Sequence, residues 1–293
     1  MITIDDKNVN DIVLDNKNVI KIQDSTTLKV LWEKVEPVVV DYFYIENTYN
    51  GNNRLVIKPS INSPVDNHIT TLQYSRDKKN WSKTTLSSAT KSFTLLPGEK
   101  FFIRNDNGYF NCSGFNIRIH CNDDFIVGGN INTLLNYKDL ENVTLTEHCF
   151  EQLFYDAKKL TSASNLVLPS TTLANLCYCD LFLNCSSLTA APALPATNLA
   201  NYCYWSTFQG CTSLTSAPIL PATNLKNGSY YYMFCNCSSL KNVTSYANNI
   251  DASYCLQNWM DGVASTGTFY NYGSASYPRN INGIPSGWTE VKN

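Results

Sequence analysis

The C-terminal half of the chain repeats one short motif at a fixed spacing. Asn-Cys-Ser-Ser-Leu ends at Leu188, Gly-Cys-Thr-Ser-Leu at Leu214 and Asn-Cys-Ser-Ser-Leu at Leu240, so the period is 26 residues (188 to 214, 214 to 240). Between these motifs, Leu-Pro-Ala-Thr-Asn-Leu ends at Leu199 and again at Leu225. A fixed period of roughly 20 to 50 residues is typical of a solenoid, in which each unit buries its apolar side against its neighbours. The period therefore favours an extended binding surface over a catalytic pocket.

Each unit is expected to contain a short parallel strand and a short helical turn. The extended run after the motif ends at Pro195 and Pro221, because proline cannot donate to a strand ladder. A Thr or Asn that follows can cap the helical turn. Equivalent side chains then stack about 4.8 Å apart on the strand side. The predicted repeat core consists of Leu160, Leu188, Leu214, Leu240, Phe154, Phe182, Phe208, Phe234, Cys185, Cys211 and Cys237.

Eleven cysteines raise the alternative of a disulfide scaffold. Their number is odd, however, and their positions follow the repeat. Besides the core cysteines there is a second register, in which Ser229 takes one place: Cys149, Cys177, Cys203 and Cys255. Free cysteine is among the most buried residue types, so we interpret both registers as buried thiols rather than disulfides or metal ligands. Whether Cys112 and Cys121 are paired stays open.

Two further modules precede the repeats, so the predicted fold class is mixed and mainly β. Residues 1–36 contain three β-rich runs about ten residues apart, which predicts a small meander. It either anchors the chain to a partner or lies as a flap on the next domain. Residues 37–128 alternate apolar and polar side chains, which predicts a β-sandwich of immunoglobulin or fibronectin type with Trp81 as a core or edge residue. Residues 129–293 then form the solenoid with its two caps.

Composition excludes several classes of function. Charged residues make up 16% of the chain and the net charge is -2, which gives no electrostatic footprint for nucleic acid or an anionic membrane. No apolar run is long enough to span a membrane. The first residues lack the basic and apolar regions of a signal peptide, so we expect synthesis and folding in a reducing cytoplasm.

Signatures of catalysis are also missing from the sequence. His68, His120 and His148 lie in different segments, with no nucleophile motif beside them. Asp123 and Asp124 are adjacent on an expected strand and should point to opposite faces, which makes them poor acid–base partners. We therefore predict no enzymatic activity, no cofactor and no metal.

The one candidate binding feature is aromatic. Tyr178, Tyr204 and Tyr230 recur in register, and large aromatic residues follow two of them directly. Neighbours on a helical turn point about 100° apart, so one set should face outward, and we favour Trp205 and Tyr231. The alternative is that the register tyrosines pack in the core. The candidate ligand-binding residues are Trp205, Tyr231, Tyr232 and Tyr204.

The repeat resembles a known family. Phe-Gln-Gly-Cys-Thr-Ser-Leu, which ends at Leu214, is similar to the BspA-like leucine-rich repeat. The variant at residues 194–204 resembles repeats in proteins of gut Bacteroidales and of their crAss-like phages. Residues 41–47, 262–269 and 283–288 also look like parts of that group. The resemblance implies surface-exposed recognition or adhesion without catalysis. The repeats depart from the family pattern at Leu183, Ser229 and Cys235, which argues against a ligand-binding surface that is the same in every repeat.

These observations predict a non-enzymatic structural or adhesion protein on the surface of a phage particle, as a head decoration, a fibre or a tail-associated part. The N-terminal module would contact other virion proteins, with the chain as a homo-oligomer on the particle. The solenoid would face host-surface or mucosal glycans or proteins. The alternative is a bacterial cell-surface adhesin whose signal peptide has been removed. A third class is an accessory module of a polysaccharide-processing enzyme.

Overall fold

The computed structural model describes residues 11–14, 18–21, 31–32, 40–61, 70–86, 89–105, 110 and 115–292. The chain divides into two compact units, Met1–Asp41 and Tyr42–Asn293. Within the described residues the fold is mainly β, with several sheets and a single four-residue helix.

The first unit contains a small antiparallel sheet. Its strands follow one another in sheet order and in chain order: β1 (Asp11–Leu14), β2 (Asn18–Lys21) and β3 (Leu31–Trp32). The rest of the meander predicted for residues 1–36 lies outside the described residues.

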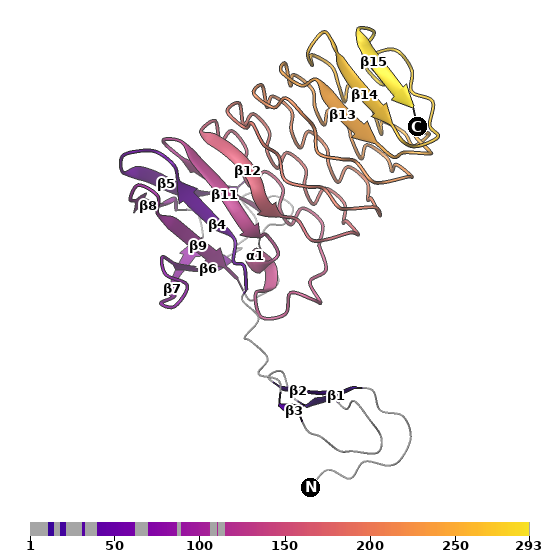
Figure 1. Cartoon of the computed structure of the whole chain (residues 1–293). Coiled ribbons are helices and arrows are strands. Elements are labelled where there is room, and N and C mark those ends of the chain that lie inside the picture. Colours follow the sequence, from indigo (N-terminus) through magenta and orange to yellow (C-terminus); the bar gives the residue numbers. More distant parts are fainter. Residues whose placement is uncertain are drawn as a thin grey trace, which may run out of the picture. The chain divides into compact units, whose positions relative to one another are not determined.

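The second unit begins with two sheets (Figure 1). One is antiparallel, in the order β10 (Phe115–Cys121), β5 (Asn53–Ile61) and β8 (Lys91–Leu95). The other is mixed, in the order β12 (Leu160–Val167), β11 (Phe125–Asn130), β4 (Tyr44–Asn47), β9 (Lys100–Arg104), β6 (Thr70–Ser75) and β7 (Ser82–Leu86). Their buried apolar residues belong to one cluster that continues into the repeats.

The mixed sheet runs across the domain boundary that the sequence suggested after residue 128. That position lies inside β11, which pairs antiparallel with β4 on one side and parallel with β12 on the other. Helix α1 (Thr133–Asn136) packs against β9, and the Thr133 Oγ1 atom accepts a hydrogen bond from the Phe43 backbone N at 3.0 Å. Residues 42–293 accordingly form one compact unit.

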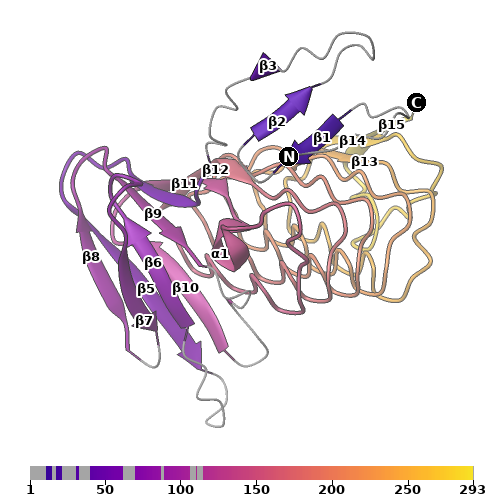
Figure 2. The same ribbon diagram turned by 90° about the horizontal axis from the view of Figure 1, so that it is seen from below.

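The repeats form coils that stack on one another from β12 towards the C-terminus (Figures 1 and 2). Backbone hydrogen bonds join equivalent positions of successive coils. The N–H of Tyr178 donates to Cys203 O at 3.0 Å, and that of Tyr204 to Ser229 O at 3.1 Å. Each coil is therefore held to its neighbour along the backbone as well as through side chains.

One side of each coil is a run of tight turns, so the predicted helical turn is wrong there. Every fourth residue has a positive φ, which interrupts an α-helix. Alternate N–H groups bond within the coil, as Cys179 N does to Leu176 O at 3.2 Å, and to the next coil, as Asp180 N does to Trp205 O at 2.8 Å. The positive-φ positions are His148, Gln152 and Asp156; Leu176, Asp180 and Asn184; Tyr202, Ser206 and Gly210; Gly228, Tyr232 and Asn236; Tyr254, Asn258 and Gly262.

The opposite side of the central coils is extended but carries only isolated bridges, such as Thr172 to Asn198 and Ser216 to Asn242. The predicted short strands are absent from residues 188–221, where four prolines remove ladder donors. Continuous parallel strands return at the C-terminal end, in the order β13 (Asn242–Ser245), β14 (Gly267–Asn271) and β15 (Trp288–Lys292).

Two columns of rings fill the interior behind the turns. In the first, Phe154, Phe182, Phe208 and Phe234 stack with centroids 5.3, 5.4 and 5.7 Å apart. In the second, Phe150, Tyr178, Tyr204 and Tyr230 stack at 5.8, 5.8 and 6.0 Å. All eleven residues assigned to the repeat core from the sequence have no exposed surface.

The cysteines of the described residues are free and buried. The thiol of each motif cysteine donates to a carbonyl oxygen of the preceding coil: Cys185 to Phe154 (3.1 Å), Cys211 to Phe182 (3.2 Å) and Cys237 to Phe208 (3.0 Å). Cys121 is a free thiol, whereas Cys112 lies outside the described residues. The thiols thus act as small core side chains that also satisfy backbone acceptors.

Candidate functional site

Five aromatic side chains form a continuous surface over three successive coils. We call this surface the aromatic face; it consists of Tyr202, Trp205, Tyr231, Tyr232 and Tyr254. Trp205 lies 5.9 Å from Tyr202 and 5.7 Å from Tyr231, measured between ring centroids. Tyr231 in turn lies 4.4 Å from Tyr232 and 6.3 Å from Tyr254. Trp205 is 37% exposed and Tyr254 59% exposed, so the rings are open to a ligand.

The turn conformation explains which rings face outward. In the coil that contains them, Cys203 and Tyr204 are buried on one side of Trp205 and Ser206 to Phe208 on the other, so Tyr204 points inward and Trp205 outward. Tyr204 is only 2% exposed and lies between Tyr178 and Tyr230 in the ring column. Tyr204 therefore leaves the set of candidate ligand residues, because it cannot touch a ligand at the surface.

Two members of the aromatic face, Tyr202 and Tyr254, were missed in the sequence. They share one register with Gly228, at steps of 26 residues (202 to 228, 228 to 254). A Cβ atom at Gly228 would lie 2.2 Å from the ring of Tyr202, so the glycine makes room for that ring. The alternation of Tyr, Gly and Tyr at the repeat spacing is the signal that could have located them.

Three tyrosines of the aromatic face occupy strained backbone positions. Tyr202, Tyr232 and Tyr254 have φ values of 54°, 52° and 59°. For a bulky residue, a left-handed conformation costs about 1–2 kcal/mol relative to the common regions. Elsewhere in the coils the same turn positions often hold Gly, Asn or Asp, which tolerate this conformation. The regular turn pattern of the coils places these three tyrosines at left-handed positions, and Tyr254 among them is 59% exposed.

Neutral hydrogen bonds hold the aromatic face in place. The Asn258 Nδ2 group donates to the Tyr232 hydroxyl at 2.8 Å, and Asn258 N donates to Asn282 Oδ1 at 2.9 Å. Desolvation, and to a smaller extent a hydrogen bond with Tyr232, raises the pKa of Tyr231. Its phenol is therefore protonated at neutral pH. The aromatic face therefore offers rings, hydroxyls and amides and carries no charge of its own.

A hollow of about 240 Å³ adjoins the aromatic face at Tyr254. We call it the side hollow. Tyr254 belongs to both features, and Asn282, which is bonded to Asn258, lies on the wall of the hollow. The other residues that line it are Ile250, Ala252, Cys255, Leu256, Gln257 and Pro278. Its walls are thus mainly apolar, with two amide side chains.

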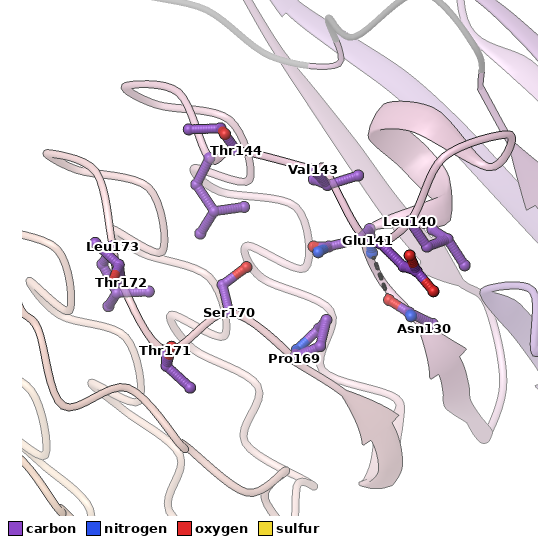
Figure 3. Close-up of a pocket in the computed structure, with 12 residues that line it drawn as sticks. Asn130, Leu140, Glu141, Val143, Thr144, Pro169, Ser170, Thr171, Thr172 and Leu173 are labelled. Carbon is purple, nitrogen blue, oxygen red and sulfur yellow. Dashed lines mark hydrogen bonds between the residues drawn. The ribbon is translucent and has the colours of Figure 1, made fainter. Parts of the chain in front are cut away.

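A separate polar cleft of about 360 Å³ lies between residues 140–145 and 169–173 (Figure 3). Ser170 comes from one loop and Thr144 from the other. The buried Oδ1 atom of Asn132, which also lines the cleft, has no hydrogen-bond partner. Asn132 N donates to Asn130 Oδ1 at 2.9 Å. The described residues that line this cleft include no aromatic side chain, so its chemistry differs from that of the aromatic face.

In the described part of the chain, one group of side chains has the donor types of a metal site: Glu151, Cys179 and Asp180, whose ligand atoms lie within 4.8 Å of one another. Gln152 Nε2 donates to Asp180 Oδ2 at 3.2 Å, and His148 Nδ1 is 2.8 Å from Glu151 Oε2. Burial raises the pKa of the Cys179 thiol, which disfavours the thiolate that binds metals. Burial also raises the pKa of Asp180 to about 6.

The other described residues singled out in the sequence lie apart from the aromatic face. Trp81 packs its ring 4.9 Å from that of Tyr42, and the guanidinium of Arg104 lies 3.7 Å from the Trp81 centroid. His120 is in β10, where burial lowers its pKa. His68 lies outside the described residues.

No protein-family model matches the sequence, no curated protein is detectably similar to it, and no solved structure matches its fold. Among the described residues, no helix has the length and apolar character needed to cross a membrane.

Proposed function

We propose that the stacked coils are a leucine-rich-repeat solenoid of the BspA-like type. The support is the 26-residue period together with the buried Leu, Phe and Cys ladders at that spacing. The two sheets that precede the coils are proposed to be a sandwich of immunoglobulin or fibronectin type, fused to the first coils through β11 and β12.

The proposed function is recognition or adhesion without catalysis. The observation that carries it is the aromatic face: five neighbouring aromatic rings, partly exposed, over successive coils. Monomeric proteins seldom leave large contiguous apolar patches exposed without a partner. Tyrosine and tryptophan supply much of the binding energy at interfaces because they combine large contact area with a polar group.

We further propose that the chain is a structural part of a phage particle, where residues 1–36 contact other virion proteins. The resemblance of the repeats to those of phages of gut Bacteroidales supports this placement. Purified particles should contain the chain, and deletion of residues 1–36 should abolish its incorporation. Unchanged incorporation of the deletion variant would reject the anchor. Recovery of the chain in the surface fraction of a bacterium, and not in particles, would support the adhesin alternative.

Binding to an array of mucin-type glycans and host-surface polysaccharides tests the recognition surface. Trp205→Ala should lower the signal about tenfold or more, as expected for loss of a central aromatic anchor. Tyr246→Ala is the matched control, because Tyr246 is 38% exposed and its ring contacts Tyr272 rather than the aromatic face. Equal signals from the wild type and Trp205→Ala would contradict the proposal.

A further inference from the structure

We infer that the aromatic face and the side hollow together form a binding site for a neutral 2-acetamido sugar, with the pyranose rings on the aromatic face and the acetamido group in the side hollow. The inference rests on the proposed function and names the ligand class of the same surface.

The two features are continuous, so one ligand can contact both. Tyr254 contributes its ring to the aromatic face and also lines the side hollow. Asn258 connects them a second time, since its Nδ2 donates to the Tyr232 hydroxyl and its backbone N donates to Asn282 Oδ1. These bonds fix the position of the hollow relative to the rings.

The rings suit the faces of pyranose sugars. A pyranose has one or both faces made of C–H groups, which lose little by leaving water and pack flat against an aromatic ring. Trp205 and Tyr231 come from successive coils, with ring centroids 5.7 Å apart and planes inclined by 35°, so a shelf of aromatic side chains spans two coils. A shelf of this kind contacts consecutive units of a chain-like ligand instead of enclosing a single small molecule.

The side hollow has the chemistry of an acetamido group. Its apolar walls, among them Ile250, Ala252 and Leu256, suit a methyl group. The amides of Gln257 and Asn282 lie on the same walls and can pair with the N–H and C=O of the substituent. Asn282 Oδ1 already accepts from Asn258 N at 2.9 Å, so the group of this side chain that can still bond a ligand carbonyl is the Nδ2 donor.

Charge separates this ligand from acidic sugars. The described residues of the aromatic face and the side hollow include no Lys or Arg, so these residues offer no cationic side chain that could pair with a carboxylate or sulfate. A buried anion without such a partner would lose its hydration without compensation. The site therefore favours neutral acetamido sugars over acidic ones.

The test is a calorimetric comparison of two trisaccharides binding to the full chain. Tri-N-acetylchitotriose and cellotriose share the β-1,4-linked backbone and differ at C2, where one carries an acetamido group and the other a hydroxyl. We expect the acetamido trisaccharide to bind at least about tenfold more tightly, which corresponds to about 1.4 kcal/mol.

Two kinds of variant separate the ring contacts from the hollow. Trp205→Ala should weaken both trisaccharides about equally. Ala252→Leu fills the hollow and should bring tri-N-acetylchitotriose down to the level of cellotriose; if it unfolds the chain, Gln257→Ala serves the same purpose. Equal affinities in the wild type would overturn the acetamido inference while leaving the proposed function intact. Absence of binding by both trisaccharides would overturn the inference as well, and the glycan array would then judge the proposed function separately.

Discussion

The phenyl rings of Phe182 and Phe208 lie parallel, with centroids 5.4 Å and planes 5° apart, although the residues are 26 positions apart in the sequence (182 to 208). The Phe182 backbone N also donates to Thr207 O at 2.9 Å, so ring and backbone contacts repeat together from coil to coil. This column supports the turn side of the coils, and hence the aromatic face outside it.

Removal of one ring from this column should be strongly destabilising. Phe208→Ala should lower the free energy of unfolding by about 3–5 kcal/mol, because the neighbouring coils cannot close the cavity. Chemical denaturation followed by tryptophan fluorescence measures the change. The control is Tyr246→Ala, which removes a ring that is 38% exposed and should cost below about 1 kcal/mol. Similar losses from both variants would contradict the ring column.

Replacing a strained tyrosine should separate stability from binding. Tyr254 has φ 59°, and asparagine tolerates that conformation better. Tyr254→Asn should therefore leave the melting temperature unchanged or raise it, while it weakens glycan binding. A loss of stability together with retained binding would show that the tyrosine serves the fold instead.

Adding a side chain at a glycine with positive φ should be unfavourable, and Gly210 is such a position. Its φ is 73°, and an added Cβ atom would lie 2.5 Å from Asn184 Oδ1 of the preceding coil. Gly210→Ala should lower the free energy of unfolding by about 1–2 kcal/mol, with little effect on binding because Gly210 is outside the aromatic face. Thermal unfolding measures it, and a neutral result would argue against the alternating turn conformation.

Asp180 should make the stability depend on pH in the acid range. Burial raises its pKa in the folded state from 3.8 to about 6. The stability it contributes is complete below pH 3.8 and is lost as the pH rises through 6, since the unfolded chain then releases the proton first. Asp180→Asn should thus be more stable than the wild type by up to about 3 kcal/mol at pH 7. Urea titrations should show no such gain at pH 3.5; a gain of equal size at both pH values would exclude this cause.

The buried thiols should make the protein sensitive to alkali. Burial raises the pKa of Cys149 and of Cys203 from 9.0 to about 12 in the folded state. The stability that these protonated thiols contribute is fully present below pH 9.0 and is lost as the pH rises towards 12. Urea midpoints should therefore fall between about pH 9 and 11. Cys203→Ser should reduce that slope, since Ser229 already fills the equivalent position of the next coil; an unchanged slope would assign the effect to other groups.

The sequence period located much of the core but not the backbone that carries it. Leu188 and Phe208 could be placed inside from spacing alone, because an apolar side chain that recurs in every unit must meet its own copy. The turn side was predicted to be helical because a Thr or Asn follows Pro195 and Pro221, where it can cap a helical turn. The distinguishing signal is the recurrence of Asn184, Gly210 and Asn236, which are residue types that accept a positive φ, at the repeat spacing.

The candidate site was predicted only in part, for a related reason. Trp205 and Tyr231 were expected to point outward and belong to the aromatic face, but by an argument from helical geometry that does not apply. Tyr204 was included among the surface residues, but it is buried, because in this turn a shift of one position along the chain separates a buried side chain from the exposed Trp205. The side hollow could not be predicted from the sequence, because Ile250 and Pro278, which line it, come from segments outside the regular repeat.

The recognition surface can be tested most directly by amide hydrogen exchange of the full chain with and without a saturating mucin-type glycan. The account predicts slower exchange in peptides that cover residues 202–206, 231–232 and 254–258, with the sheets before the coils unaffected. Protection confined to other coils or to those sheets, or no protection at all, would contradict it.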